Sequence, residues 1–400
     1  MRDALLVMAG IPCLTAVGFC LFSILSAALF FSKKRETGAD FLPPVSILKS
    51  VRGVDKGTQE NLASFCRQDY PDYQVLFGVH DPEDPVIPLI RRLMQQFPDR
   101  DIGLTLCGRT AGMNPKMSNL AQMEGQAKHP FILVCDSDIR VGKDYLRRLV
   151  RPMRDPRVGA VTCMCHSLSK GWIGTLEALR EVTEFCPNVL VANQLEGIQF
   201  GLGAAILARK EAIQRIGGFA SIADYLADDY LLGNRIARAG YKVLLSNVVV
   251  EHELSLVRWR DLIRRRIRWN RGIRACRPAG YRGLFLTFGV PMSALFLAAA
   301  RFSAAGWAVL AATWSSRLVM ARVIGVRYFN DRAARRYLWM IPLNDLLSFG
   351  LWFAGFFGNK IYWRGQVFQL TREGKLKPIL KPGPVPVRDY DDSPLVATPQ

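Results

Sequence analysis

Short apolar runs alternate with longer amphipathic segments between residues 44 and 165. The amphipathic segments have helical periodicity at 56–68, 86–97, 116–127 and 142–153. The apolar runs predict strands at Val45–Leu48, Tyr73–Val79, Ile102–Cys107, Phe131–Cys135 and Gly159–Cys163. This alternation predicts an α/β domain with a mostly parallel sheet and helices on both faces. Ligands of such sheets bind beyond the carboxyl ends of the strands, so residues directly after strands are the candidates for chemistry.

Much longer apolar runs lie near both ends of the chain. Residues 4–32 are nearly all apolar and end at Lys33-Lys34-Arg35. About 20 apolar residues cross a bilayer, so this run predicts a retained transmembrane helix. A secretory signal peptide is the alternative, but its apolar part would be shorter, and no convincing cleavage site precedes the basic cluster. Because basic flanks favour the cytoplasm, we expect the N-terminus outside and the next domain inside.

Three further apolar stretches predict membrane helices in the last third of the chain, at 283–300, 302–320 and 338–358. Three crossings would place the tail outside, whereas the basic residues between Lys360 and Lys381 favour the cytoplasm. The last stretch, interrupted by Asp345, is therefore the candidate for a re-entrant or interfacial segment. Either Asp345 faces protein or a water-filled cavity, or it lies near the headgroups.

The charge of the chain is unevenly distributed. The 400 residues carry a net charge of +19, and half of them are apolar, which excludes a disordered protein. Such a basic excess indicates binding to nucleic acid or to an anionic membrane. Residues 44–257 are almost neutral at +1, whereas residues 258–400 hold 24 basic and 7 acidic residues. The nine cysteines lack the paired spacings of a zinc site, so we expect free thiols in a reducing cytoplasm.

Asp136-Ser137-Asp138 directly follows the predicted buried strand Phe131–Cys135. Two carboxylates at this spacing form a hard-oxygen site, which suits Mg²⁺ or Mn²⁺ together with substrate phosphates. A capped loop is the alternative interpretation of a bare D-x-D pattern. Placement after a buried strand of an α/β unit favours the metal site.

Two other loops are expected at the same edge of the sheet. The acidic turn with Asp81 and Asp84 follows the strand Tyr73–Val79, and Asp84 precedes Pro85 as a helix cap would. Contact with a nucleotide base or ribose is the functional interpretation, and both can hold. The second loop contains Lys116 at a predicted helix N-terminus, where a diphosphate could bind.

Two charged segments close this region. Asp228-Asp229 opens a helix in an otherwise apolar stretch, which fits helix capping or a general base with a raised pKa. Residues 258–277 hold nine arginines, one acid and two tryptophans. This composition predicts an amphipathic helix on a membrane surface. Nucleic-acid binding is the alternative, and the flanking apolar stretches favour the membrane.

In chain order the motifs read D-P-E-D-P, D-S-D, A-D-D-Y and R-R-I-R-W. This series resembles the D, D, D, (Q/R)xxRW series of membrane-bound family 2-like glycosyltransferases. A closer similarity lies in the stretches ILKSVRGVD, QDYPDY, MNPKMSNL, CDSDIRV and IGGF. These stretches look like ceramide glucosyltransferases, glycosyltransferase family 21, and their bacterial relatives. The resemblance covers about residues 44–275.

The resemblance implies a GT-A fold, a Rossmann-like mixed sheet, with Asp229 as the catalytic base. It also implies that Asp136 and Asp138 bind a divalent metal, Mg²⁺ or Mn²⁺, beside the diphosphate. The residues that it assigns to the nucleotide-sugar site are Asp81, Asp84, Lys116, Asn119, Asp136, Arg265, Arg268 and Trp269. This chain departs from the animal enzymes, which read D-S-G at the second motif and His-Pro in place of Cys186-Pro187, so its acceptor pocket can differ.

The implied activity is that of a hexosyltransferase that moves glucose from a UDP-sugar to the hydroxyl of a ceramide-like membrane lipid. A hopanoid polyol, a diacylglycerol and a polyisoprenyl phosphate are alternative acceptors, and a processive polysaccharide synthase shares the same motif series. Outside this class, a membrane-tethered nucleic-acid-binding protein would use the arginine helix, and a transporter would normally have more spans. We expect no nucleic-acid partner.

The expected organisation follows the chain. An N-terminal anchor (1–36) precedes a cytoplasmic GT-A catalytic domain (44–257) and a basic amphipathic interfacial helix (258–280). Membrane helices (281–360) and a tail that is first basic and then proline-rich (361–400) complete it. We expect an integral protein of the bacterial inner membrane, with its catalytic domain in the cytoplasm.

Overall fold

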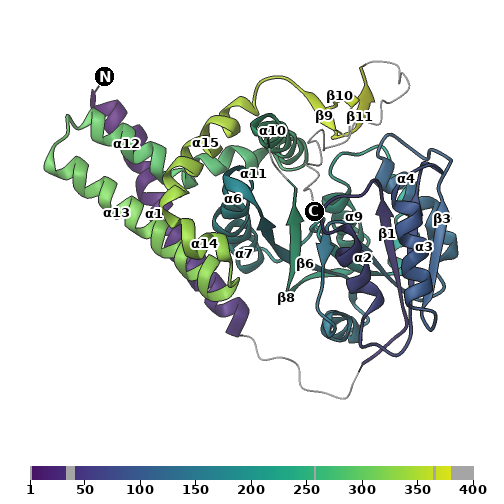
Figure 1. Ribbon diagram of the computed structural model, residues 1–400. Coiled ribbons are helices and arrows are strands. Elements are labelled where there is room, and N and C mark those ends of the chain that lie inside the picture. Colours follow the sequence, from purple (N-terminus) through teal and green to yellow (C-terminus); the bar gives the residue numbers. More distant parts are fainter. Residues whose placement is uncertain (1, 33–40, 256–257, 364–365, 380–400) are drawn as a thin grey trace, which may run out of the picture.

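A mixed β-sheet forms the centre of the part of the molecule on the right of Figure 1. The computed structural model describes residues 2–32, 41–255, 258–363 and 366–379. Within these ranges eight strands form the sheet in the order β3-β2-β1-β4-β7-β6-β8-β5. The strands are β1 Val45–Val51, β2 Tyr73–Val79, β3 Asp101–Leu106, β4 Phe131–Cys135, β5 Ile139–Arg140, β6 Val158–Ser169, β7 Ala205–Arg209 and β8 Lys242–Leu254. The predicted strands are therefore confirmed.

The sheet is parallel on one side and mixed on the other. β1 pairs in parallel with β2 and β4, and β2 pairs in parallel with β3, as predicted. β7 then runs antiparallel to β4 and β6, and β5 runs antiparallel to β8. The carboxyl ends of β1, β2 and β4 consequently meet at one edge, where ligands of such sheets bind.

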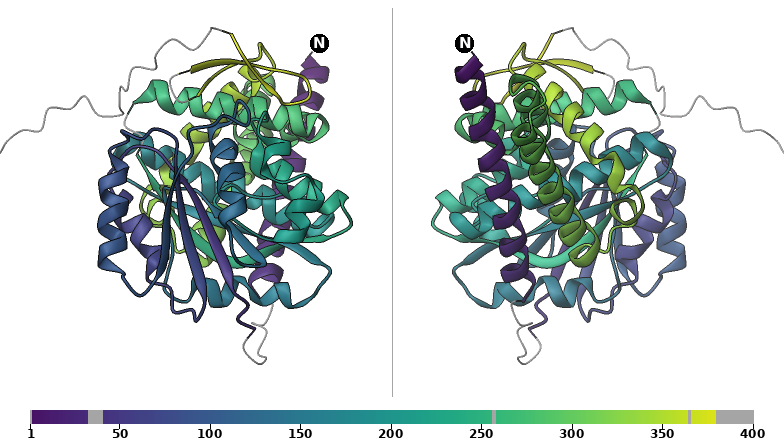
Figure 2. Two further views of the ribbon diagram at one scale, coloured as in Figure 1. Left: turned by 90° about the vertical axis from the view of Figure 1, so that its right-hand side faces the viewer. Right: turned by 90° about the vertical axis from the view of Figure 1, so that its left-hand side faces the viewer.

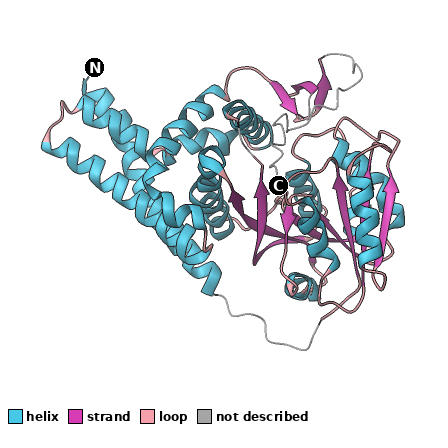
Figure 3. Cartoon of the chain, viewed as in Figure 1, coloured by secondary structure: helices cyan, strands magenta, loops and turns pink. Residues whose placement is uncertain are grey.

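Helices cover both faces of the sheet (Figure 3). α2 (Thr58–Cys66), α3 (Val86–Gln96) and α4 (Pro115–Met123) match the predicted helices, while the helix expected at 142–153 is shorter. It consists of α5 (Tyr145–Leu149) and a separate 3₁₀ turn, Arg151–Arg154. Pro152 lies inside that turn, where its missing N–H and fixed φ disfavour a continuous α-helix.

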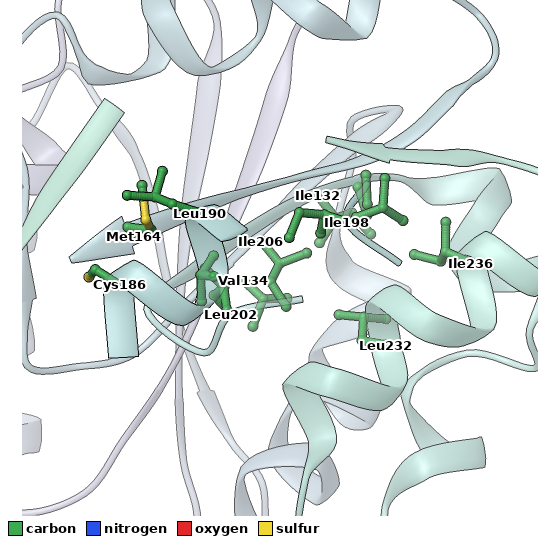
Figure 4. Packing of buried hydrophobic residues seen from close by; sticks show 14 of the residues in the cluster. Ile132, Val134, Met164, Cys186, Leu190, Ile198, Leu202, Ile206, Leu232 and Ile236 are labelled. Atoms are coloured by element: carbon green, nitrogen blue, oxygen red, sulfur yellow. The ribbon is translucent and has the colours of Figure 1, made fainter. Parts of the chain in front are cut away.

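The β4 strand shows why the central sequence is so apolar. Ile132 and Val134 point into the cluster drawn in Figure 4, together with Ile206 of β7 and Leu232 of α9 (Asp228–Arg238). Phe131, Leu133 and Cys135 belong to the cluster on the opposite face, since successive strand residues alternate between faces. A strand buried on both faces reads as a continuous apolar run rather than an alternating one.

The cysteines follow the same packing rule. All nine lie in the described ranges and are free, as expected, and only Cys276 is partly exposed. Cys163 and Cys165 share one face of β6. Cys186 lies in the apolar cluster of Figure 4 beside Met164 and Leu190. Its side chain is thus a core group of the protein.

The membrane-type helices differ in part from the prediction. In the described ranges two helical segments are long and apolar enough to cross a bilayer, Leu6–Ser32 of α1 (Arg2–Ser32) and Ala304–Tyr328, which includes α13 (Ala304–Ala321). The run expected at 283–300 is divided between Pro278–Thr287 and α12 (Gly289–Ala299), which meet at 53° and count as a third span only if taken together. α15 (Ile341–Ala354) has 14 residues, too few to span.

The apolar helices and the catalytic sheet share one core. α1 lies beside α12 and α13, as the right-hand view of Figure 2 shows for the purple and green helices. Cys20, Ala27 and Phe30 on its inner side belong to the same buried cluster as Ile132 of β4. The eight-stranded sheet is therefore packed directly against the apolar helices.

A small antiparallel sheet follows α15. It contains, within the described residues, β9 (Lys360–Trp363), β10 (Gln366–Leu370) and β11 (Leu376–Pro378). β9 contacts α10 (Trp259–Cys276), so the first part of the expected tail is folded against the predicted arginine helix. The basic cluster Lys33-Lys34-Arg35 and the proline-rich segment after Lys381 lie outside the described residues.

Asp345 is buried in protein rather than placed among headgroups. Its side-chain oxygens accept two hydrogen bonds from the Arg317 guanidinium of α13, at 2.7 and 2.8 Å. Arg317 also donates to the carbonyl of Thr183, in the π-helical turn Glu181–Phe185. This bidentate pair ties α13 and α15 to the segment that leads into the catalytic sheet.

Removing one partner of this pair should destabilise the fold. Asp345→Ala leaves the Arg317 charge buried without its carboxylate, which costs about 3–5 kcal/mol of unfolding free energy. Thermal unfolding in nanodiscs should show a clear drop in Tm for Asp345→Ala and substantial recovery in Arg317→Leu/Asp345→Leu. A double variant as unstable as the single variant would contradict this account.

Candidate active site

The predicted metal motif forms a tight turn between β4 and β5. The Asp136 carbonyl accepts a hydrogen bond from the Ile139 amide, and the Asp138 carbonyl accepts one from the Glu253 amide of β8. The Lys49 ammonium of β1 also donates to the Asp136 carbonyl, at 2.8 Å. The backbone of the turn is therefore anchored from both sides, which leaves its two carboxylates to project beyond the sheet edge.

Lys116 joins two of the acidic motifs. Asn114 caps α4 by accepting hydrogen bonds from the Lys116 and Met117 amides, and this cap fixes the start of the helix. The Lys116 ammonium then lies 2.6 Å from Asp136 Oδ1 and 3.3 Å from Asp228 Oδ2. Burial alone would lower the pKa of Lys116, but these carboxylates raise it above its ordinary value. Lys116 is consequently a fixed cation of the site.

Asp229 faces the same space as Asp136. Gly203 lies between them: a Cβ at that position would be 2.9 Å from Asp229 Oδ2 and 3.5 Å from Asp136 Oδ2. Asp229 Oδ1 accepts a hydrogen bond from the Tyr230 amide at 2.7 Å. Burial and the neighbouring Asp228 charge raise the pKa of Asp229 to about 6, against the opposing effect of Lys116. This carboxyl can therefore exchange a proton near neutral pH.

His252 is a site residue that sequence reasoning missed. The antiparallel pairing of β5 and β8 sets it opposite Ile139, and its Nε2 lies 3.3 Å from Asp138 Oδ2. Burial opposes its protonation, but Asp138 and Glu181 raise the pKa of His252 to about 10. The polar positions in the strand sequence VVVEHEL are the only signal for it, and they do not reveal which carboxylate the histidine meets.

The far side of His252 is also occupied. Ser167 Oγ lies 2.9 Å from its Nδ1, and Glu181 Oε2 lies 3.8 Å from the same nitrogen. Glu181 in turn accepts from Cys165 Sγ at 2.8 Å and from the Ser167 hydroxyl. Glu181 opens the π-helical turn between α6 (Gly171–Arg180) and α7 (Cys186–Leu195), an irregularity often found at functional sites. These partners fix the orientation of the imidazole ring.

The donor set fits a divalent cation such as Mg²⁺ or Mn²⁺. Within the described residues, the buried Asp138 Oδ1 atom has no hydrogen-bond partner. A buried carboxylate oxygen without a donor is costly, and a bound cation would satisfy it. Carboxylate oxygens from Asp136 and Asp138 suit either ion. His252, whose pKa is raised, lies beside this pair as a cation that faces Asp138.

The first acidic motif lies at the same edge but has structural partners. The Asp84 carboxylate accepts hydrogen bonds from the Gly53 amide at 2.9 and 3.0 Å and from the Val86 amide at 2.9 Å. It therefore joins the loop after β1 to the start of α3, in agreement with the capping interpretation. Asp81 is exposed and accepts from the Glu83 amide.

Asn119 and two aromatic–arginine stacks complete the predicted set. Asn119 Nδ2 donates to Ser50 Oγ at the end of β1, and in the described chain its buried Oδ1 has no hydrogen-bond partner. The Arg265 guanidinium lies 4.5 Å from the Trp269 ring centroid, and its charge contributes to lowering the pKa of Asp138. Arg268 lies 5.6 Å from the Trp363 ring of β9.

Three other arginines of α10 contact protein groups, in addition to the interfacial role expected for this helix. Arg266 is 3 % exposed and pairs with Glu177 of α6 at 2.7 Å and with Asn344 of α15 at 2.8 Å. Arg271 and Arg274 donate to backbone carbonyls just after α15, at Phe356, Phe357 and Gly358. These side chains bind the helix to its protein neighbours, so only the remaining surface of α10 can meet a membrane.

The mixed sheet with an acidic turn after its central strand defines a GT-A glycosyltransferase fold. The model of "Glycosyl transferase family 21" matches residues 11–376, and the chain belongs to this family. The mannosyltransferase PcManGT from Pyrobaculum calidifontis, solved with GDP-Man and Mn²⁺, has a similar fold, with a TM-score of 0.53 and 19 % identity. The comparison covers 88 % of this chain and 98 % of that one.

Curated relatives carry the name ceramide glucosyltransferase. Ceramide glucosyltransferase 3 of Caenorhabditis elegans is 31 % identical over 257 residues, which are 63 % of this chain and 56 % of the relative. The ceramide glucosyltransferase of Candida albicans is 34 % identical over 119 residues, which are 26 % of this chain and 22 % of the relative. The chain therefore spans about half the length, or less, of the curated relatives that it matches.

The space beside Gly203 should be essential for transfer. In Gly203→Ala the new methyl group would displace the Asp229 carboxylate, and a misplacement of this size is expected to lower kcat by about 10- to 100-fold. Circular dichroism and Tm should change little, because a flexible side chain can yield. Gly125→Ala is the matched control, since nothing lies within 4 Å of its Cβ position. Unchanged turnover in Gly203→Ala would contradict the placement of Asp229 at the reacting centre.

Proposed function

We propose that this protein is an inverting glycosyltransferase that transfers glucose from a UDP-sugar to the hydroxyl of a ceramide-like membrane lipid. The observation that carries the proposal is the pairing, across Gly203, of Asp136 in the metal motif with Asp229, whose pKa is raised to about 6. A single displacement at a sugar carbon requires a metal-binding carboxylate for the leaving group and a proton-accepting carboxylate for the attacking hydroxyl. Asp136 and Asp229 face one space and can supply these two groups. The names of the family's curated relatives support glucose and ceramide.

The donor end of the site combines carboxylates for a metal with basic side chains near the place where the diphosphate would lie. Asp136 and Asp138 would hold Mg²⁺ or Mn²⁺, which when bound neutralises charge on the leaving diphosphate. Lys116 carries a fixed positive charge at the N-terminus of α4, and that helix end favours anions. Arg265 and Arg268 lie on α10 as further cations. Asp81, Asp84 and Asn119 are proposed to contact the nucleoside.

The acceptor end depends on Asp229. Its carboxylate accepts the proton of the acceptor hydroxyl while the hydroxyl oxygen bonds to the anomeric carbon. The bond from that carbon to the diphosphate oxygen breaks in the same step, and the nucleoside diphosphate leaves with the bonding electrons. Attack from the opposite side inverts the configuration, so an α-linked donor gives a β-glycoside. Preorganised charges aimed at the leaving group supply much of the rate enhancement in such reactions.

The membrane helices explain how a lipid can be the acceptor. Because α1 shares its buried cluster with β4, the sheet is held close to the apolar helices. We propose that residues 44–257 form the cytoplasmic catalytic domain and that residues 1–36 and 281–360 anchor it in the bacterial inner membrane. A ceramide-like lipid could then present its hydroxyl at the surface while its chains stay in the bilayer.

A direct test supplies membranes containing the protein with several UDP-sugars and a total lipid extract. Mass spectrometry should detect a new hexosylceramide with UDP-glucose and none with the blank Asp136→Asn/Asp138→Asn. Glucosylation of another lipid would retain the reaction and replace the acceptor. A polymeric product, or transfer only to water-soluble acceptors, would overturn the proposal.

The transfer rate should follow the protonation of Asp229. The carboxylate is the active form, so kcat/KM should reach a plateau about one pH unit above the pKa of Asp229. It should fall as pH decreases through about 6, by about tenfold per pH unit at lower pH. Asp228→Asn removes a neighbouring charge that raises this pKa, so the acidic limb should move to lower pH. A pH profile of both proteins measures the shift. An acidic limb at the same pH in both would exclude Asp229 as the titrating base.

A further inference from the structure

Two tryptophans from different helices stack on the outside of the catalytic half. Trp172 lies in the first turn of α6 and is 53 % exposed, and Trp259 is the first residue of α10 and is 38 % exposed. Their rings meet edge to face with centroids 4.7 Å apart. Ile263, one turn further along α10, is 36 % exposed. Large apolar side chains held at a surface in this way mark an interaction site.

The surroundings of the pair are positively charged. Lys170, Arg258 and Arg260 are exposed next to the two tryptophans in sequence, and the nearby acid, Asp261, is partly buried. Helices α6 and α10 both begin beside the tryptophans, and each helix N-terminus adds partial positive charge. We call Lys170, Trp172, Arg258, Trp259, Arg260 and Ile263 the tryptophan patch. Aromatic rings with basic flanks are typical of protein segments at the headgroup level of anionic membranes.

The patch is continuous with a helix of the membrane part. Behind the tryptophans, Ile173, Leu254 and Leu262 form a small buried cluster, against which Leu347 of α15 packs. On the same helix Leu343 and Leu346 are 52 % and 49 % exposed. Figure 1 shows α15 and α10 side by side between the sheet and the apolar helices, and the two are in contact. An apolar surface therefore leads from α15 towards the patch.

We infer that the tryptophan patch inserts into the headgroup layer of an anionic bilayer and there aligns the lipid acceptor with the site. The rings would occupy the boundary between headgroups and chains, while Lys170, Arg258 and Arg260 contact lipid phosphates. The alignment of the acceptor rests on the proposed function, whereas the bilayer contact does not. This inference moves the membrane contact of α10 from its arginine-rich length to its first turns, because Arg266, Arg271 and Arg274 have protein partners.

The full-length protein in nanodiscs allows the contact to be measured without activity. Nanodiscs of phosphatidylglycerol, with or without bromine atoms on the upper acyl chain, give the lipid-quenched fraction of tryptophan fluorescence. Subtracting the tryptophan fluorescence of Trp172→Phe/Trp259→Phe from that of the wild type gives the emission of these two rings. Bromolipid should quench this emission, and aqueous acrylamide should quench it poorly. Trp307→Phe, a 52 % exposed residue of α13, provides the comparison for a membrane-facing tryptophan. A pair quenched by acrylamide and not by bromolipid would overturn the inference.

A second measurement tests the alignment of the acceptor. The Trp172→Ala/Trp259→Ala variant should raise KM for the lipid acceptor on the order of tenfold, because roughly half of two large rings loses its lipid contact. KM for the UDP-sugar should stay within about twofold. Equal KM for the lipid in both proteins would overturn the alignment. If no lipid accepts sugar from the wild type, the proposed function fails, and the quenching experiment still decides the bilayer contact.

Discussion

Concentrated negative charge at one edge of the sheet is the constraint on which the structure depends. The carboxylates of Asp136, Asp138, Asp228 and Asp229 gather at this partly exposed edge, where like charges destabilise one another. The Lys116 ammonium offsets this repulsion between Asp136 and Asp228. The positive charge of His252 offsets it beside Asp138. Burial and the neighbouring Asp228 charge raise the pKa of Asp229, against the opposing effect of Lys116. The same electrostatics therefore produce a cation-binding end and a proton-accepting end.

The fold serves this constraint through backbone placement. Strands β4, β5 and β8 fix the metal motif and His252 in register, while Gly203 leaves room for the carboxylates to face one another. Charged pairs also join neighbouring helices. Arg266–Glu177 joins α10 to α6, and Arg317–Asp345 joins α13 to α15. The membrane part and the catalytic part are thus one packed body in the described residues, which suits a reaction with a lipid.

Local sequence patterns predicted the α/β fold, the strands β1 to β4 and β6, and the DSD turn, because burial on both faces leaves a readable apolar run. They predicted neither β7 nor β8, and the antiparallel direction of β7 depends on contacts distant in sequence. His252 was missed for the same reason, as its partner Asp138 is reached only through the β5–β8 pairing. The arginines of α10 formed a correct helical pattern, but α15 and β9 decide which of them are buried. These outcomes depend on tertiary contacts rather than on local propensity.

The most direct measurement of the central claim compares donor binding with transfer in Asp229→Asn. Calorimetric titration with UDP and Mn²⁺ should give a Kd within about twofold of wild type, because the donor end of the site is intact. Transfer from UDP-glucose should fall by about 100- to 10,000-fold, the usual contribution of a general base. Retained transfer, or loss of UDP binding together with transfer, would contradict the division of this acidic edge into a donor end and a proton-accepting end.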